Sequence, residues 1–272
     1  MDIKKLCEII DLQQEVTKQV LYYYESINTE DIFPILTELS LRQTWDGGYN
    51  KLKDILGDDP DGFKILTCML IFALNTHEVY KSKGIPQEIF VSTMKFFTRF
   101  INEHMVSFGD YRFVWAWWVA RQISCNEFRI GELEYETVDN NGCKSISIHI
   151  PSDAVIREEN LRKSYLDACD FFAKYYPDYK DAEMNCDSWM LSPALEKLLP
   201  ATSNILIFQK AFIIERIDYD TNYFMYWVYK RDDIPLEKLP ENTSLQRRMK
   251  EYILNGGKVG SAFGKLVKNP FC

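Results

Sequence analysis

The sequence has few histidines and no closely spaced pair of cysteines. Its three histidines, His77, His104 and His149, show no metal-ligand spacing with one another or with the cysteines, so we expect no metal site. The seven cysteines are scattered and odd in number, and none belongs to a CxxC motif. This pattern argues against a disulfide framework and is typical of reduced thiols in a cytoplasm.

Long apolar runs and an excess of basic residues are also missing. No segment reaches the roughly 18 apolar residues of a membrane span, and the longest run, "ILTCMLIFAL", suits a buried helix. The N-terminus, "MDIKKLCEIIDLQQE", carries acids, unlike a signal peptide, so we expect a cytoplasmic protein. The formal net charge of −8 argues against nucleic-acid binding, which relies on Lys and Arg to neutralise phosphates. We expect no membrane partner either, and the oligomeric state stays open.

The 272 residues are enough for two hydrophobic cores, and the apolar period changes near residue 125. Before it, apolar residues recur at helical spacing. The segments that predict helices are "QQEVTKQVLYYYESI", "TEDIFPILTELS", "GFKILTCMLIFALNTHEVYKSKG", "IPQEIFVSTMKFFTRFINEHMVSFG" and "DYRFVWAWWVARQIS". We therefore predict a helical N-terminal domain over residues 1–125 and a second domain over residues 126–272.

After residue 125, strands predominate. "FRIGELEYETV" and "KSISIHI" alternate with period two around Asn141-Gly142, the strongest short hairpin signal. A helix over about 157–176 follows, then the strand "EMNCDSWML" and the short helix "SPALEKLLP". We predict two further strands, "NILIFQKAFIIERI" and "NYFMYWVYK", and a last helix from Thr243 to Asn255. The fold class is α+β, with a mixed, mostly antiparallel sheet flanked by helices.

The hairpin brings an acid opposite a histidine. If Asn141 and Gly142 form the turn, the numbers of paired residues sum to 283, so Glu134 faces His149. Directly opposed side chains lie about 5 Å apart at Cβ, within reach of a hydrogen bond. A Glu beside a His can hold the imidazole in one tautomer and support its action as a general base. The alternative interpretation is a solvated cross-strand pair on the wet face of a sheet.

Several long motifs carry a family resemblance. "FRIGELEYE", "IHIP", "CDSWMLSPALEKLLPATSNILIF" and "LPENTSLQRRM" resemble the family known as the GNAT-like C-terminal domain, and residues 1–125 resemble the helical N-acyltransferase domain that precedes it. The resemblance implies a GNAT acyltransferase fold and the use of acetyl-CoA or another acyl-CoA. It also implies that the pantetheine arm enters a gap between two splayed strands, and that the pyrophosphate meets a helix N-terminus.

The resemblance implies roles for individual residues. The pantetheine would lie along the strand that contains Ile148 and Ile150, and Ser152 and Arg157 would favour the pyrophosphate. Ser188 or Cys186 would point at the thioester, although Cys186 also suits the role of a small buried hydrophobe. Two departures stand out: "PSDAVIREEN" lacks the glycines of the family's phosphate loop, and Leu198 stands where a tyrosine often acts as general acid.

We therefore expect an acyltransferase that moves an acyl group from acyl-CoA to an amine or hydroxyl of a small-molecule acceptor. Glu134 and His149 would be the acid/base pair, with Ser188 as a third catalytic residue. The alternative is a GNAT-shaped module that has lost CoA binding and is not catalytic. A basic segment over residues 246–268 offers a second phosphate site or an ordinary charged helix face. Its bases are Arg247, Arg248, Lys250, Lys258, Lys265 and Lys268.

Overall fold

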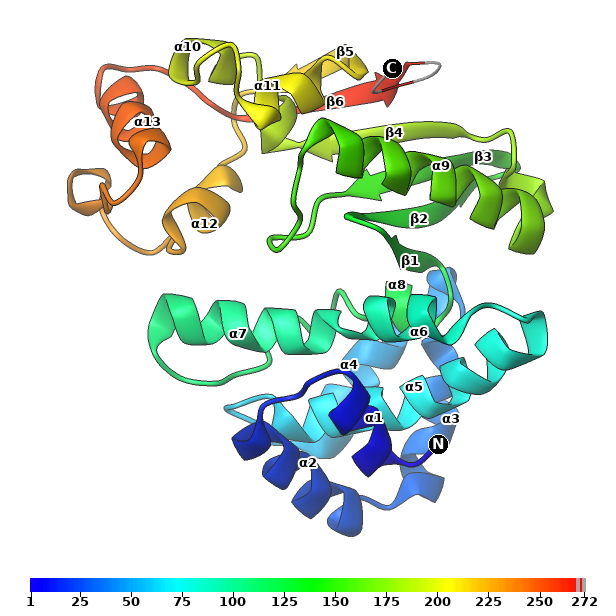
Figure 1. The fold of residues 1–272 in the computed structure, drawn as a ribbon. Coiled ribbons are helices and arrows are strands. Elements are labelled where there is room, and N and C mark those ends of the chain that lie inside the picture. Colours follow the sequence, from blue (N-terminus) through cyan, green and yellow to red (C-terminus); the bar gives the residue numbers. More distant parts are fainter. Residues whose placement is uncertain (268–269, 271–272) are drawn as a thin grey trace. The chain divides into compact units, whose positions relative to one another are not determined.

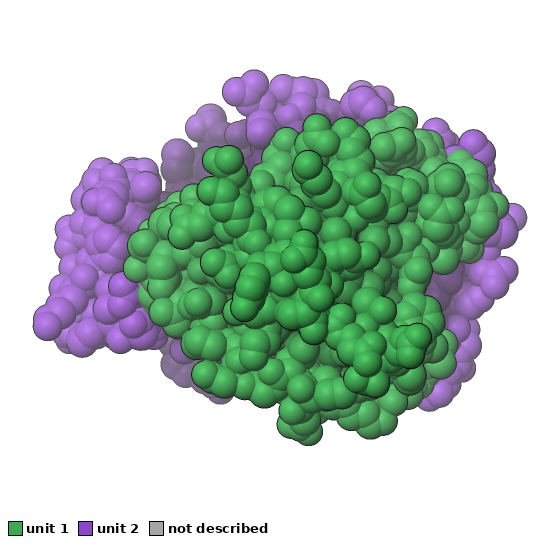
Figure 2. All heavy atoms as spheres, turned by 90° about the horizontal axis from the view of Figure 1, so that it is seen from below, with its two compact units in different colours: residues 1–129 green, residues 130–272 purple. Residues whose placement is uncertain are grey.

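The chain divides into two compact units, residues 1–129 and residues 130–272 (Figure 2). The computed structural model describes residues 1–267 and Pro270, so Lys268 and Cys272 lie outside the described residues. Strand β1 (Glu127–Ile130) contains the point of division. Among the helices of the described part, none is long and apolar enough to cross a membrane.

Unit 1 is helical, as the period of its apolar residues predicts. Helix α5 packs against α1, α2, α3, α4, α6 and α8, and it contributes more buried residues than any other helix of the unit (Figure 1). The helix ends at Gly84, which adopts the left-handed conformation that favours glycine. The elements are α1 (Ile3–Ile9), α2 (Gln14–Ser26), α3 (Thr29–Glu38), η1 (Arg42–Thr44), α4 (Trp45–Leu56), α5 (Phe63–Lys83), α6 (Gln87–Met94), α7 (Phe96–Phe108) and α8 (Ala120–Ile123).

Two helix predictions in unit 1 were too long. The segment that begins at Ile85 forms two helices, α6 and α7, which meet at Lys95. The aromatic segment "DYRFVWAWWVARQIS" is helical only in α8. Its indole rings contact one another, with the Trp115 and Trp117 centroids 5.5 Å apart. The apolar spacing that predicted a helix therefore comes from aromatic rings that pack together in a series of turns.

The strands form a six-stranded sheet in the order β1-β2-β3-β4-β6-β5. Among the strand pairs in the described part of unit 2, only β3–β4 is parallel, so the predicted α+β class with a mostly antiparallel sheet is confirmed. The strands of unit 2 are β2 (Leu133–Asn140), β3 (Cys143–His149), β4 (Glu183–Ser188), β5 (Phe212–Asp218) and β6 (Ser261–Leu266). The β5–β6 register shifts between Ile214 and Arg216, which leaves Glu215 as the extra residue of a bulge.

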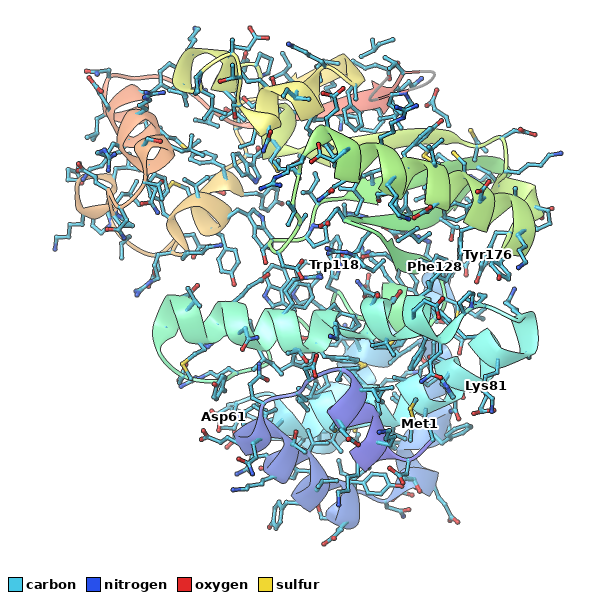
Figure 3. The ribbon with its side chains drawn as sticks, in the orientation of Figure 1. Met1, Asp61, Lys81, Trp118, Phe128 and Tyr176 are labelled. Carbon is cyan, nitrogen blue, oxygen red and sulfur yellow. The ribbon has the colours of Figure 1, made fainter. Side chains whose placement is uncertain are left out.

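Helix α9 (Glu158–Tyr175) lies along one face of this sheet (Figure 1). Its buried side chains meet the apolar side of the hairpin, where the Tyr135 and Phe172 ring centroids are 6.4 Å apart. Tyr176 follows the last turn of α9, labelled in Figure 3, and stacks on Phe171 with centroids 5.8 Å apart. The turn η2 (Pro177–Tyr179) then leads to β4.

The later helices of unit 2 build a second core. They are η3 (Trp189–Leu191), α10 (Leu195–Leu198), α11 (Asn204–Gln209), α12 (Phe224–Tyr229), η4 (Leu236–Lys238) and α13 (Ser244–Leu254). Leu198 on α10, Met225 on α12 and Met249 on α13 are buried together there. The last helix begins with a capping box, because Thr243 accepts from the Gln246 N–H while the Gln246 side chain accepts from the Thr243 N–H.

Two strand predictions in this part were wrong. "NILIF" is helix α11, capped by the Ser203 hydroxyl, which accepts from the Ile205 N–H, and only its continuation forms β5. "NYFMYWVYK" contains helix α12 instead of a strand. Aromatic residues favour strands locally, but Phe224 and Tyr229 are buried in the second core, so tertiary packing outweighed local preference.

Candidate functional site

The β2–β3 hairpin has the predicted register. Glu134 opposes His149 and Tyr135 opposes Ile148, down to the Asn140–Cys143 pair next to the turn. Asn141 and Gly142 both have positive φ, as the commonest two-residue hairpin turn requires. Tyr135 and Ile148 are buried on the side that faces α9, so the opposite face of the hairpin carries the candidate polar residues.

His149 makes a hydrogen bond with Glu136. The distance between His149 Nε2 and Glu136 Oε2 is 2.9 Å. Glu136 lies two residues along β2 from the residue that opposes His149, which makes it the diagonal neighbour. Diagonal neighbours lie within reach of long side chains. The sequence reasoning paired His149 with the directly opposed Glu134 and assigned no role to Glu136.

The two acids of β2 on the His149 face, Glu134 and Glu136, are buried. The side chain of Glu136 is 6% exposed and that of His149 is 24% exposed. Glu134 is also buried. The solvated wet-face pair that the sequence left open therefore does not describe this cluster. A carboxylate that accepts from Nε2–H fixes the neutral ring in the tautomer whose lone pair is on Nδ1.

The parallel pairing of β3 and β4 is short. It comprises Ser145 with Glu183, Ile146 with Met184 and Ser147 with Asn185. Both strands continue beyond the last pair, β3 to His149 and β4 to Ser188. Backbone groups of Ile148 and its successors therefore lie outside the β3–β4 ladder. The β3–β4 ladder thus ends at Ser147, two residues before His149.

Cys186 and Ser188 lie on the part of β4 that pairs with β6 but not with β3. The Ser188 hydroxyl accepts a hydrogen bond from the Met190 N–H at 3.1 Å and caps η3. Cys186 is fully buried, and burial raises the pKa of its thiol. A thiol held protonated is a poor nucleophile, which fits the small-hydrophobe interpretation of Cys186.

The loop that follows β3 holds the two remaining candidate residues. Ser152 and Arg157 are both exposed, and Arg157 is the N-cap residue of α9 without a side-chain cap bond. One backbone N–H of the loop, that of Val155, donates to the carboxylate of Glu132 at 2.8 Å. Sequence reasoning missed Glu132, because nothing in the local pattern links the turn before β2 to this loop.

The described bases of the C-terminal segment contact groups of the chain itself. Arg247 and Arg248 donate to the carbonyl oxygens of Glu241 and Leu198. Lys250 pairs with Glu241 at 2.7 Å. Ion pairs also join Lys258 to Asp220 and Lys265 to Glu183 and Glu215. These contacts favour the charged-face interpretation over a second phosphate site.

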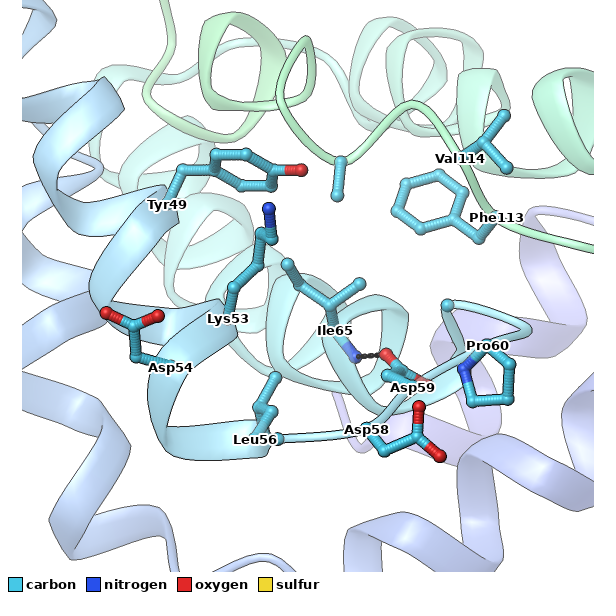
Figure 4. A pocket seen from close by; sticks show the side chains of 13 residues that line it. Tyr49, Lys53, Asp54, Leu56, Asp58, Asp59, Pro60, Ile65, Phe113 and Val114 are labelled. Atoms are coloured by element: carbon cyan, nitrogen blue, oxygen red, sulfur yellow. Dashed lines mark hydrogen bonds between the residues drawn. The ribbon is translucent and has the colours of Figure 1, made fainter.

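Unit 1 has a hollow of about 570 Å³ beside the α4–α5 turn (Figure 4). Tyr49 and Lys53 of α4 border it on one side and Phe113 on another. The Lys53 ammonium lies 5.2 Å from the centroid of the Tyr49 ring. Asp59 also lines the hollow, but its carboxylate accepts from the N–H groups of Lys64 and Ile65, so it serves to cap α5.

Several solved structures are similar to this chain along nearly its whole length. An acyltransferase in complex with decanoyl-CoA shares 17% identity at a TM-score of 0.78, covering 96% of this chain and 86% of its own. A mutant acyltransferase in complex with octanoyl-CoA has 16% identity and a TM-score of 0.77 at the same coverage. An acyltransferase with decanoyl-CoA and teicoplanin shares 17% identity at a TM-score of 0.71, covering 98% and 99%. A comparison with curated proteins gave no match.

Family comparisons match both parts of the chain. Residues 1–125 match the N-acyltransferase N-terminal domain, and residues 127–266 match the GNAT-like C-terminal domain. The second match alone covers more than half of the chain. The chain belongs to the GNAT-like C-terminal domain family, and an N-acyltransferase N-terminal domain precedes that domain in the sequence.

Proposed function

We propose that this protein is an acyltransferase that moves an acyl group from acyl-CoA to an amine or hydroxyl of a small-molecule acceptor. The observation that carries the proposal is the short β3–β4 ladder, which ends just before His149. Family membership supports it, as do similar folds that bind octanoyl-CoA and decanoyl-CoA. We assign the transfer chemistry to residues 126–272 and keep residues 1–125 as a separate domain.

In this proposal the acyl-pantetheine arm binds along β3 beyond the ladder. The backbone of Ile148 and Ile150 supplies hydrogen-bonding groups that β4 does not use in its ladder. If the parallel register continued, Ile150 would be level with Ser188, so the thioester would lie between the ends of the two strands. Ser152 and Arg157 would lie beside the end of the pantetheine arm that is farther from the thioester.

His149 is the proposed general base. The acceptor nitrogen attacks the thioester carbonyl carbon while Nδ1 of His149 takes the amine proton. The new C–N bond forms, the C–S bond breaks, and the electron pair leaves with sulfur as a thiolate. The thiolate then recovers the proton from the imidazolium, so the products are an amide and a free thiol.

The carboxylates and Ser188 assist this step in the proposal. Glu136 holds the imidazole through the 2.9 Å hydrogen bond and stabilises the imidazolium that forms. Glu134, directly opposite in the ladder, adds a second negative charge beside the ring. The Ser188 hydroxyl accepts from the Met190 N–H and keeps its own hydrogen to donate to the leaving sulfur.

A melting experiment tests the proposal on the whole chain. Octanoyl-CoA at a hundredfold excess over its Kd stabilises the folded state by about 2.7 kcal/mol. For a protein of this size that corresponds to a rise in Tm of about 5–10 °C. ADP at the same concentration is the control for nucleotide effects. Unchanged Tm values with octanoyl-CoA and decanoyl-CoA at millimolar concentration would refute the proposed function.

A further inference from the structure

The loop between β3 and α9 binds a carboxylate of the chain itself, that of Glu132. Glu132 Oε2 accepts from the Val155 N–H at 2.8 Å, and Glu132 Oε1 accepts from the Asn160 side chain at 3.4 Å. The Asn160 amide also donates to the Val155 carbonyl at 3.3 Å. The Glu132 carboxylate therefore bridges the loop and the first turn of α9, where a bound phosphate would otherwise meet the helix dipole.

Other amides of this loop donate within the loop. The Ala154 N–H donates to the Pro151 carbonyl at 3.0 Å, and the Arg157 N–H donates to the Val155 carbonyl at 2.8 Å. No glycine lies between Pro151 and Arg157, so the backbone lacks the residue type that lets a phosphate approach closely. The loop is thus folded on itself and on Glu132.

The position of Glu132 is fixed by buried contacts on both sides of it in the sequence. The Ser164 hydroxyl of α9 donates to the Ile130 carbonyl and accepts from the Leu133 N–H. Gly131 has a φ of +61°, and a Cβ placed there would lie 3.0 Å from the Cβ of Ser164. The turn that bears Glu132 is therefore held tightly against α9, so the carboxylate occupies its place as part of the fold.

The charge of the first turn of α9 adds to that of Glu132. Glu158 and Glu159 are the first two residues of the helix. Arg157 is the only base between Ile150 and Glu159. A pyrophosphate at this helix end would have to displace the Glu132 carboxylate and would face two further carboxylates at short range.

We propose that Glu132 replaces the donor's pyrophosphate at the α9 N-terminus, so that the site recognises the acyl-pantetheine arm and gains nothing from the nucleotide half of CoA. The donor class is then any acyl thioester of pantetheine, with or without a nucleotide. The inference rests on the proposed function and specifies its donor. The chemistry is unchanged: the C–S bond breaks, and the pantetheine thiol leaves with the proton that the acceptor lost.

Calorimetric titration of the full chain with octanoyl-CoA and with S-octanoyl-pantetheine tests this, at low ionic strength where charge effects are largest. The two Kd values of the native protein should agree within about threefold. Glu132→Gln removes the carboxylate charge beside the α9 N-terminus, so the helix dipole can act on the pyrophosphate and octanoyl-CoA should bind about tenfold more tightly. The affinity for S-octanoyl-pantetheine should not change. Glu237→Gln, which removes an exposed acid of η4, is the control for net charge.

Each result decides the matter. A native protein that binds octanoyl-CoA ten times more tightly than S-octanoyl-pantetheine, or more, would overturn the inference while supporting the proposed function. This comparison needs no variant, so it stands even if Glu132→Gln folds poorly. A folded Glu132→Gln protein with unchanged affinity for both donors would also overturn the inference. If neither thioester binds, the proposed function fails together with it.

Discussion

The hydroxyl groups of Tyr135 on β2 and Ser164 on α9 lie 3.0 Å apart in the buried layer between sheet and helix. Ser164 is fully buried, and its hydroxyl also contacts the Ile130 carbonyl and the Leu133 N–H. Burial raises the pKa of Tyr135, so its phenol stays protonated and able to donate throughout the ordinary pH range. One serine thus satisfies polar groups from both sides of the turn before β2.

Replacement of this serine should be costly. Ser164→Ala leaves a buried hydroxyl and two backbone groups without this partner, and each unsatisfied group costs about 1–3 kcal/mol. We expect a loss of about 3 kcal/mol in the free energy of unfolding, measured in urea. Tyr135→Phe alone should cost about 1 kcal/mol, and the double variant should lose less than the sum of the two. Strict additivity would contradict the network.

Two glycines with positive φ provide a matched pair. In Gly131→Ala the new Cβ adds a contact with Ser164 at 3.0 Å to the strain of a left-handed backbone. In Gly142→Ala the backbone strain is the same, but no atom lies within 4 Å of the new Cβ. Strain of this kind costs about 1–3 kcal/mol. We expect Gly131→Ala to lower the unfolding free energy by at least about 1 kcal/mol more than Gly142→Ala. Equal losses would show that the close approach to α9 does not constrain the turn.

Substitutions at His149 and at the two acids on its face should lower kcat for acyl transfer. His149→Ala should lower kcat for acyl transfer by about a hundredfold, the lower range for loss of a general base, with KM for octanoyl-CoA little changed. Glu136→Gln should cost more than Glu134→Gln, because the Glu136 carboxylate lies 2.9 Å from the ring Nε2. Ser145→Ala, on the same face of β3 and paired with Val138, is the control. A larger loss with Glu134→Gln would reverse the two assignments.

Buried thiols should make stability depend on alkaline pH. Burial raises the pKa of Cys7, Cys68 and Cys125 to about 12. Above pH 9 the unfolded thiols lose protons that the folded thiols keep, so stability falls between about pH 9 and 12, by up to about 1.4 kcal/mol per pH unit for each thiol. Cys68→Ala should make this decline shallower in urea unfolding measured at successive pH values. An unchanged slope would contradict the assignment.

The same burial predicts which thiols react in the folded state. Cys143 is exposed in the hairpin, whereas Cys7, Cys68 and Cys186 are buried. We expect a thiol reagent at pH 8 to modify Cys143 first among the cysteines of residues 1–267, with the three buried thiols modified only after unfolding. Peptide mass mapping of the modified sites measures this order. Early modification of Cys68 would contradict the packing of α5.

Local signals predicted the hairpin more accurately than the segments after β4. Asn141-Gly142 specifies both the turn and its register, so every pair from Glu134–His149 to Asn140–Cys143 followed from two residues. The hydrogen bond between His149 and Glu136 did not follow, because the reach of a diagonal carboxylate depends on side-chain rotamers. Glu136 could have been considered, since it shares the face and lies two residues away.

Helices α11 and α12 show why other predictions failed. Their apolar and aromatic runs are too short for helical periodicity to separate them from buried strands. Tyr229 on α12 donates to the Gln246 carbonyl of α13 at 3.0 Å, and the Gln246 side chain donates to the Val228 carbonyl at 2.9 Å. These hydrogen bonds join residues that are 17 and 18 positions apart in the sequence, so no local pattern predicts them. Glu132 and its loop are a case of the same kind.

The bulge in β5 bears on whether copies of the protein aggregate through the edge of the sheet. β5 ends the sheet order, so one side of its backbone has no neighbouring strand within the described residues. Such edges invite strand addition by another chain and the start of aggregates. The extra residue, Glu215, pairs with Lys265 at 3.0 Å, and the exposed Arg216 pairs with Asp187 at 3.1 Å. Irregular backbone and charge therefore lie together on the strand where an intruding chain would attach.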